Sequence, residues 1–185
     1  MTVKKIRTPL SDAMVDDLMA GDIVLLSGII YKARDSAHGR MVELISQDKE
    51  LPFDVHGNII YYVGPAPTPP GKVCGSAGPT TSSRMDANTP SLLDLGLKGM
   101  IGKGLRSKEV IQSMLKNKCV YFSATGGAAA LISKSIKSIQ VIAFKDLGTE
   151  AIHKMKIVDF PVIVTIDSQG NNLYEIGQKK YHSLK

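Results

Sequence analysis

The sequence predicts an α/β protein, and three observations lead to this class. Runs rich in Val, Ile and Leu alternate along the chain with segments of helical periodicity, the pattern of strands joined by helices. The length of 185 residues fits one domain, so we expect residues 1–185 to form a single domain with a frayed tail from about residue 177. Hydrophobic residues make up 43% and charged residues 22%, as in ordinary globular proteins, and an aromatic share of 5% without tryptophan predicts an aliphatic core.

The chain opens with a strand, a helix and a second strand. Residues 2–8 predict the first strand, and Ser11 can cap a helix that has acidic residues near its positive end. Residues 22–31 form a β-branched run typical of a buried strand. We expect this strand to bend at Gly28.

A strand-to-helix junction comes next. Asp35 or Ser36 is expected to cap a helix whose apolar residues recur on one side. Arg34 therefore lies between a strand and a helix, where α/β proteins commonly place ligand contacts. Residues 58–63 predict the following strand.

The middle of the chain continues the alternation. Residues 64–71 are rich in proline and predict a stiff extended connection. A short helix is expected to begin near Thr89, with a proline in its first turn. Residues 97–104 are strand-like and then rich in glycine, Ser107 can open an amphipathic helix, and residues 118–124 predict another strand.

The last quarter of the chain predicts two more buried strands. Residues 138–144 and 161–166 are β-branched, and we expect a helix over residues 149–155 between them. A final short strand from residue 173, followed by the basic tail, completes the prediction.

Residues 71–86 combine glycine, proline and hydroxyl side chains with a single arginine. Small residues let a ligand approach the backbone, and successive free N–H groups can form a concave anion-binding nest. Arg84 adds a planar fork that suits a carboxylate or a phosphate. From composition alone, an ordinary surface loop explains the stretch equally well.

Three further segments share this combination of flexible backbone with a cation or free amides. With residues 80–84, the set comprises Arg34, Gly102-Lys103-Gly104 with Arg106, and Gly126-Gly127. Together they predict a site for a small dianion that carries a carboxylate at each end. The sequence contains no nucleophile elbow, HExxH, P-loop or dinucleotide-binding fingerprint, and no Ser/His/Asp arrangement.

The charge of the chain admits a second class of function. Lysine and arginine number 23 against 17 acidic residues, which gives a formal charge of +6. Such a charge suggests nucleic acid, but the basic residues are scattered and are not interleaved with aromatic stacking residues. A small anionic substrate or an acidic partner explains the charge equally well. A non-catalytic anion- or nucleic-acid-binding module therefore remains the alternative hypothesis to an enzyme.

The two cysteines, Cys74 and Cys119, lie far apart and lack metal-ligand spacing. Reduced thiols and a cytoplasmic protein are therefore expected, with no metal held by this chain. The N-terminus has no apolar signal region and no run reaches about 18 apolar residues, so we expect neither export nor a membrane partner. His38 is a secondary site candidate because it lies near Arg34.

Several strings occur together in a fixed order: Ala33 to His38, Gly78 to Asp86, Met100 to Ser107, Thr125 to Ala130, Leu147 to Lys154, and Asp159 to Pro161. The series resembles the β-subunit, or C-terminal domain, of iron–sulfur-dependent class I fumarate hydratases and the related L(+)-tartrate dehydratases. The resemblance covers roughly residues 2–176. The Gly-Pro-Thr-Thr-x-x-Arg-Met-Asp string is its most specific part.

The resemblance implies a swivelling β/β/α-type domain and a hydro-lyase. The reaction would be reversible dehydration of a 2-hydroxydicarboxylate, foremost (S)-malate to fumarate and water, with L(+)-tartrate to oxaloacetate as the alternative. The resemblance also implies a [4Fe–4S] cluster held by three cysteines of a separate α-subunit, an α2β2-type heterotetramer, and no nucleic-acid partner. The chain would then be active only together with that α-subunit.

Roles for individual residues follow from the same resemblance. Thr80 matches the position of the base, and Arg34, Arg84 and Lys103 match contacts to the substrate carboxylates. A threonine hydroxyl is a very weak base that needs local activation, so Thr80 as a residue that only orients substrate is an equal alternative. The secondary candidates are His38, Thr81, Gly126 and Gly127.

Overall fold

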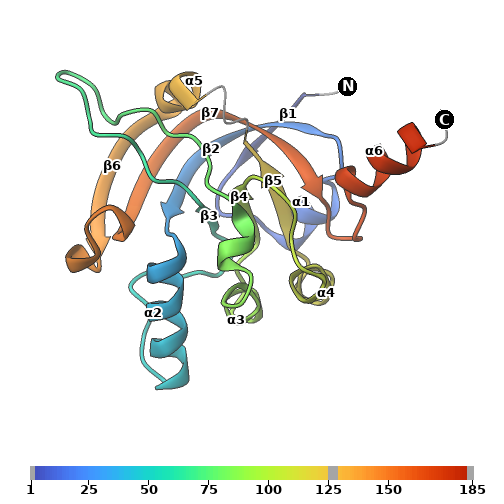
Figure 1. Cartoon of the computed structure of the whole chain (residues 1–185), viewed down its shortest axis with the longest axis horizontal. Coiled ribbons are helices and arrows are strands. Elements are labelled where there is room, and N and C mark those ends of the chain that lie inside the picture. The colour runs from blue at the N-terminus through green and yellow to red at the C-terminus, as the bar shows by residue number, and fades with distance from the viewer. Residues whose placement is uncertain (1–2, 125–128, 183–185) are drawn as a thin grey trace.

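The computed structural model describes residues 3–124 and 129–182, and its elements alternate along the chain (Figure 1). The strands are β1 (Val3–Arg7), β2 (Ile23–Lys32), β3 (Ile59–Tyr61), β4 (Gly99–Gly102), β5 (Val120–Ser123), β6 (Ile136–Ala143) and β7 (Ile152–Ile166). The α-helices are α1 (Asp12–Asp16), α2 (Asp35–Ser46), α3 (Thr89–Asp94), α4 (Lys108–Asn117), α5 (Ala129–Ser135) and α6 (Leu173–His182). Within the described residues, the 3₁₀ helices are η1 (Ser82–Met85) and η3 (Lys145–Glu150).

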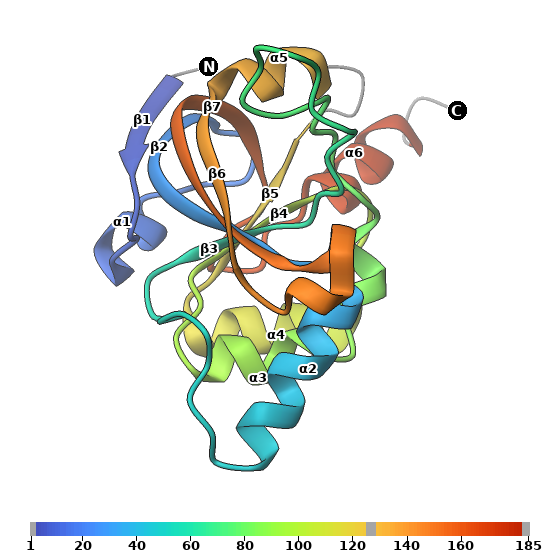
Figure 2. The same cartoon turned by 90° about the vertical axis from the view of Figure 1, so that its left-hand side faces the viewer.

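The strands form one sheet in the order β1-β2-β3-β4-β5-β7-β6. Strands β1 to β5 run parallel to one another, whereas β7 is antiparallel to β2, β5 and β6. The additional β2–β7 pairing closes the sheet on itself. Helices α2, α3 and α4 lie together on one side of this curved sheet, and α5 lies on the opposite side (Figures 1 and 2). The α/β class that the sequence predicts is confirmed.

Strand periodicity divides the core into two parts. Along β3, Ile59 and Tyr61 belong to the cluster inside the closed sheet, while Ile60 belongs to the cluster beneath α2, α3 and α4. Strand β5 does the same, because Val120 packs inside the sheet and Tyr121 packs toward the helices. Successive side chains of a strand point to opposite faces, so strands covered on both faces read as continuous apolar runs.

Several local predictions are confirmed. Ser11 caps α1 by accepting a hydrogen bond from the Met14 amide, and Ser107 caps α4 through the Val110 amide. Gly28 has a φ of 121° and lies at a register shift in the β2–β7 pairing, which is the expected bend.

The capping residue of α2 was predicted wrongly. Arg34 occupies the N-cap position in extended conformation without a side-chain capping bond, so that Asp35 is the first helical residue. An acidic side chain in the first turn still suits the positive end of the helix.

Two predicted elements near the C-terminus are also wrong. Residues 152–155 belong to the 15-residue strand β7, where we expected a helix, because both edges of this strand find partners in β2, β5 and β6. Residues 173–182 form α6 where we expected a short strand. Asn172 accepts a hydrogen bond from the Tyr174 amide and contacts Glu175, a helix-start pattern present in the sequence. Helix α6 continues to His182 within the segment expected to fray, and residues 183–185 lie outside the described residues.

Candidate functional site

Four of the predicted site residues, Arg34, Thr80, Arg84 and Lys103, lie on segments that meet at the carboxyl edge of the parallel strands. Arg34 follows the end of β2 and Lys103 follows the end of β4. Beyond β3, the Thr80 amide donates to the Tyr62 carbonyl at 2.7 Å, and the Lys103 amide donates to the Thr80 carbonyl at 3.3 Å. Parallel strands present their carboxyl ends at one edge, where open α/β sheets bind ligands. The fold thus brings together segments that are about 70 positions apart in the sequence.

Arg34 is held by an acidic side chain and by a glycine. Its Nη2 lies 3.3 Å from Glu150 Oε1, and its side chain is 18% exposed. A Cβ atom at Gly64 would lie 2.6 Å from Arg34 Nη1, so glycine at this position lets the guanidinium lie against the backbone. The Nε atom is buried and has no hydrogen-bond partner among the described residues. Arg34 therefore has one buried donor that is not hydrogen-bonded among the described residues.

Arg84, on η1, forms an ion pair with Asp35 across the site. Arg84 Nη2 lies 2.5 Å from Asp35 Oδ2, and the arginine side chain is 46% exposed. Burial opposes ionisation of Asp35, but the hydrogen bond from Arg84 and the nearby arginine charges hold its pKa below the ordinary value. The other oxygen, Oδ1, is buried and unpartnered among the described residues, 3.9 Å from Arg34 Nε. One carboxylate thus lies between the two arginines.

Lys103 is an exposed cation on a tightly packed turn. Among the described residues its ammonium group makes no hydrogen bond or ion pair, although its backbone pairs with Thr81 in a parallel bridge. A Cβ atom at Gly102 would lie 1.9 Å from Ser82 Oγ, and Gly104 has a φ of 84°. Both glycines are therefore required for the close approach of the Lys103 turn to the Thr80–Ser82 segment. Thr80 is half-buried and Thr81 is exposed.

The Gly126-Gly127 pair lies outside the described residues, so its predicted role stays a prediction. The strand that leads toward it, β5, ends at Ser123 beside Gly102 of β4. The approach from β5 is therefore at the same edge of the sheet as Lys103.

His38 lies beneath Arg34 and is fully buried. Its Nδ1 contacts the Arg34 carbonyl at 2.8 Å, which makes Nδ1 the protonated nitrogen, and its Nε2 has no partner among the described residues. Burial lowers the pKa of His38 to about 4, although the hydrogen bond to Arg34 opposes this effect. His38 is therefore neutral at pH 7 and contacts the backbone of Arg34. Its role in the site stays a prediction.

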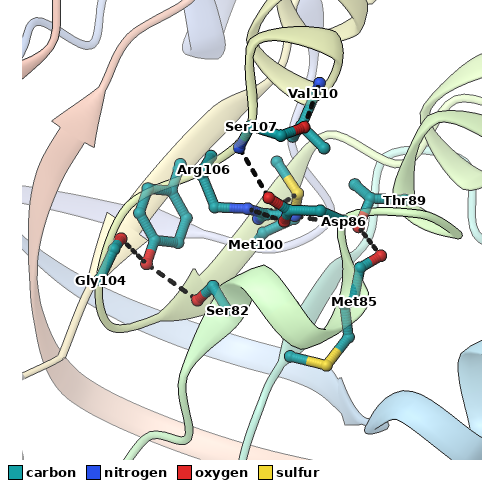
Figure 3. A network of polar contacts seen from close by, with 10 residues as sticks. Ser82, Met85, Asp86, Thr89, Met100, Gly104, Arg106, Ser107 and Val110 are labelled. Atoms are coloured by element: carbon teal, nitrogen blue, oxygen red, sulfur yellow. Dashed lines mark hydrogen bonds and ion pairs between the residues drawn. The ribbon is translucent and has the colours of Figure 1, made fainter.

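Arg106 differs from the expectation that it accompanies Lys103 as a ligand cation. Its side chain is fully buried, and its Nε donates to Asp86 Oδ1 at 2.7 Å (Figure 3). Nη2 donates to Thr89 Oγ1 at 3.0 Å, and the guanidinium lies over the rings of Tyr62 and Tyr121 at 5.4 and 5.2 Å. Because its guanidinium is hydrogen-bonded and buried, Arg106 packs beneath the site and is not exposed at it.

This buried network connects the two loops that carry the site. Asp86 accepts from Arg106 through one oxygen and from the Ser107 amide through the other, at 2.6 Å (Figure 3). Tyr121 adds a second link, since its hydroxyl donates to the Gly104 carbonyl at 3.0 Å and lies 2.9 Å from Ser82 Oγ. Sequence reasoning missed these supporting roles. Asp86 at the end of the Gly78–Asp86 string was the available signal, because an acidic residue is out of place in an anion-binding loop unless it pairs with a cation.

The cysteines do not fit an iron–sulfur cluster. Cys74 and Cys119 are free and buried, and Cys119 Sγ donates to the Leu97 carbonyl at 3.0 Å. Burial raises the pKa of both thiols, that of Cys119 to about 12. Cluster ligands are thiolates, and several are needed. Over residues 3–124 and 129–182, no group of three or more His, Cys, Asp or Glu residues is arranged to hold a metal ion.

No helix in the described part of the chain is both long and apolar enough to cross a membrane.

The chain is thus an α/β domain with a closed sheet, and two arginines and a lysine lie near the carboxyl edge of its parallel strands. The model of the family described as fumarase C-terminus matches residues 2–177, and the chain belongs to this family.

Three relatives of this chain include one of similar length and two much longer proteins. A protein of Methanocaldococcus jannaschii, provisionally named L(+)-tartrate dehydratase subunit beta, is 40% identical over 92% of this chain and 91% of its own length. Fumarate hydratase 2 of Leishmania major is 39% identical over 93% of this chain and 30% of its own length. The anaerobic class I fumarate hydratase of Escherichia coli is 41% identical over 81% of this chain and 28% of its own length. The chain therefore spans less than a third of these two fumarate hydratases.

Proposed function

We propose that this chain is the β-subunit of an iron–sulfur hydro-lyase that reversibly converts (S)-malate to fumarate and water. The observation that carries the proposal is that the segments bearing Arg34, Thr80, Arg84 and Lys103 meet at one edge of the sheet. Three cations on neighbouring segments suit a small substrate with two carboxylates. Family membership and the names of the relatives supply the reaction class.

In this proposal, the cations bind and orient the dicarboxylate. Dehydration removes a proton from one carbon and the hydroxyl group from its neighbour, and the C–H electron pair becomes the new double bond. Negative charge accumulates on the carboxylate next to the carbon that loses the proton. The cations that bind this carboxylate stabilise that charge.

Thr80 is proposed as the base, with substrate orientation as the equal alternative. Its backbone is fixed on both sides, by the Tyr62 carbonyl and by the Lys103 amide, so Thr80 is held next to the Lys103 turn. Nearby positive charge favours the alkoxide form that a base would need. Thr80→Ala in the assembled enzyme should lower kcat by about 100-fold or more while changing KM little. An effect confined to KM would exclude the base role.

The cluster and its ligands are proposed to belong to a separate α-subunit in an α2β2-type cytoplasmic assembly. Support comes from the buried, high-pKa thiols of this chain and from the subunit designation of the archaeal relative. The roles proposed for Arg34, Thr80, Arg84 and Lys103 do not depend on how the cluster is bound.

The test is anaerobic co-expression with a candidate α-subunit, cluster reconstitution, and measurement of malate, fumarate and tartrate turnover. Activity that requires both chains is expected. Turnover by this chain alone would contradict the shared site, and an assembled pair inactive on all three compounds would contradict the hydro-lyase assignment.

Tartrate dehydration is the second candidate, and one comparison favours it. The archaeal relative that matches this chain over 91% of its own length carries the tartrate dehydratase name. The product would be oxaloacetate after tautomerisation of the enol. The ratio of kcat/KM for L(+)-tartrate to that for (S)-malate, measured on the same preparation, decides between the two substrates.

A further inference from the structure

We propose that Lys32 and Glu150 are positioning residues that hold the Arg34 guanidinium in its substrate-binding orientation. The inference rests on the proposed function, because it gives Arg34 a substrate carboxylate to bind. Its structural basis is a chain of contacts that runs from the end of β2, through η3, back to the first turn of α2.

The first contact joins Lys32 to the backbone around Glu150. Lys32 is the last residue of β2 and is 1% exposed. Its Nζ donates to the carbonyl of Thr149 and, at 3.1 Å, to that of Ala151. These two carbonyls flank Glu150, so one ammonium group fixes the backbone on both sides of the acidic residue.

The second contact joins Glu150 to the site. Its Oε1 lies 3.3 Å from Arg34 Nη2, and its Oε2 accepts a hydrogen bond from the Ser36 amide at 2.9 Å. The carboxylate is 18% exposed and both of its oxygens are engaged. Glu150 therefore ties the guanidinium to the N-terminal turn of α2, and the orientation of Arg34 depends on where η3 holds Glu150.

The surroundings of Lys32 show why the chain of contacts from Lys32 through Glu150 to Arg34, here called the tether, matters. Lys32 lines a cavity of about 360 Å³ together with Gly148, Thr149 and His153. Gly148 breaks the 3₁₀ conformation with φ 55° and ψ −116°. A kinked segment beside open space has room to move, and the two hydrogen bonds from Lys32 oppose such movement.

Lys32 has no ion-pair partner within the described residues, and a buried unpaired cation is costly. The charged and titratable groups facing it are Arg34 beyond β2, Glu150 on η3, and His153 opposite it on β7. Burial lowers the pKa of Lys32 to about 8, the charge of Arg34 acts in the same direction, and Glu150 opposes it. An apolar side chain would avoid this cost, whereas lysine supplies charge-assisted hydrogen bonds to two carbonyls.

The experiment compares Lys32→Met and Glu150→Gln with a control, Lys98→Met, in the assembled enzyme. Lys98 is also a buried lysine whose Nζ donates to a carbonyl, that of Asn117 at 2.7 Å, but it precedes β4 at the opposite end of that strand from Lys103. Both site variants should raise KM for the dicarboxylate about tenfold and leave kcat within about threefold, as expected for weakened binding by one charged group. Lys98→Met should lower thermal stability without raising KM.

Amide hydrogen exchange of Ser36 gives a readout that does not need turnover. Lys32→Met and Glu150→Gln should accelerate exchange at Ser36 by about tenfold or more, and Lys98→Met should not. Unchanged KM in an active enzyme, or unchanged Ser36 exchange, would overturn the positioning role. If the wild-type assembly turns over none of the dicarboxylates, the proposed function fails by itself, and Ser36 exchange then decides whether the tether exists.

Discussion

His38 should make the stability of this protein depend on pH between about 4 and 6.5. Its ring is fully buried beneath Arg34, and burial lowers its pKa from 6.5 to about 4. In this pH range the unfolded chain binds a proton at His38 that the folded chain does not bind. The free energy of unfolding therefore falls as pH decreases from 6.5 to 4, and the full stability is present above pH 6.5.

The magnitude follows from the two pKa values. At about 1.4 kcal/mol for each pH unit, the difference between them amounts to ~3 kcal/mol. Other groups also titrate in this range, so the wild-type protein must be compared with a variant that lacks only this proton. His38→Leu removes it, and His56→Leu, at an exposed histidine, is the matched control.

The assay is urea unfolding followed by circular dichroism at pH 7, 6, 5 and 4.5. At pH 7 the wild-type protein should be more stable than His38→Leu, because the variant loses the hydrogen bond to the Arg34 carbonyl. The free energy of unfolding of the wild-type protein relative to that of His38→Leu should fall by about 2–3 kcal/mol between pH 7 and pH 4.5, enough to cancel or reverse the advantage of the wild-type protein. A difference that stays constant within about 0.5 kcal/mol across these pH values would refute the buried, neutral histidine.

Three further predictions concern the scaffold and the cations. Arg106→Met leaves Asp86 buried without its cation and should lower the free energy of unfolding by about 3–5 kcal/mol. The control, Arg40→Met, removes an exposed ion pair and should lower it by less than about 1 kcal/mol. Equal losses would contradict the structural role of the network. Arg84→Lys keeps the charge but loses the planar fork, so KM for the dicarboxylate should rise about tenfold, and wild-type kinetics would show that the fork is unimportant. Gly102→Ala places a Cβ atom 1.9 Å from Ser82 Oγ, so it should lower the free energy of unfolding by about 1–3 kcal/mol and reduce kcat/KM. The control, Gly39→Ala, lies in a helix where the new Cβ meets nothing within 4 Å, and it should leave stability unchanged or raise it. Unchanged stability and activity in Gly102→Ala would contradict the close approach of the two loops.

Much of the fold could be predicted from local chemistry. The bend at Gly28 and the caps at Ser11 and Ser107 depend on backbone conformation and on side chains a few residues away, so the sequence contains the full cause. The β-branched run of β2 is similar, because burial on both faces selects apolar residues at every position.

Elements whose state depends on distant partners were predicted less well. Residues 152–155 became a strand because β2 and β6 lie on either side of them, and neither neighbour is visible in a local window. Residues 173–182 became a helix despite their β-branched and aromatic start, since Asn172 and Glu175 satisfy its first turn.

By itself, the sequence determined that this protein has three cationic side chains beside flexible or junction backbone, Arg34, Arg84 and Lys103, which are proposed to bind an anion. It determined the α/β class as well, because strand and helix periodicities alternate along the chain. These properties depend on residue type and short-range spacing, which the chain order preserves.

Only the tertiary structure decided what each charge does. Arg106 is paired with Asp86 and buried, Arg34 and Arg84 each face an acidic residue, and Lys103 has no ion pair within the described residues. Ion pairing and desolvation depend on distances of a few ångströms between residues far apart in sequence, and closing the sheet sets those distances. The structure therefore distinguishes the cations that are proposed to bind a dicarboxylate from Arg106, which is buried in a structural network.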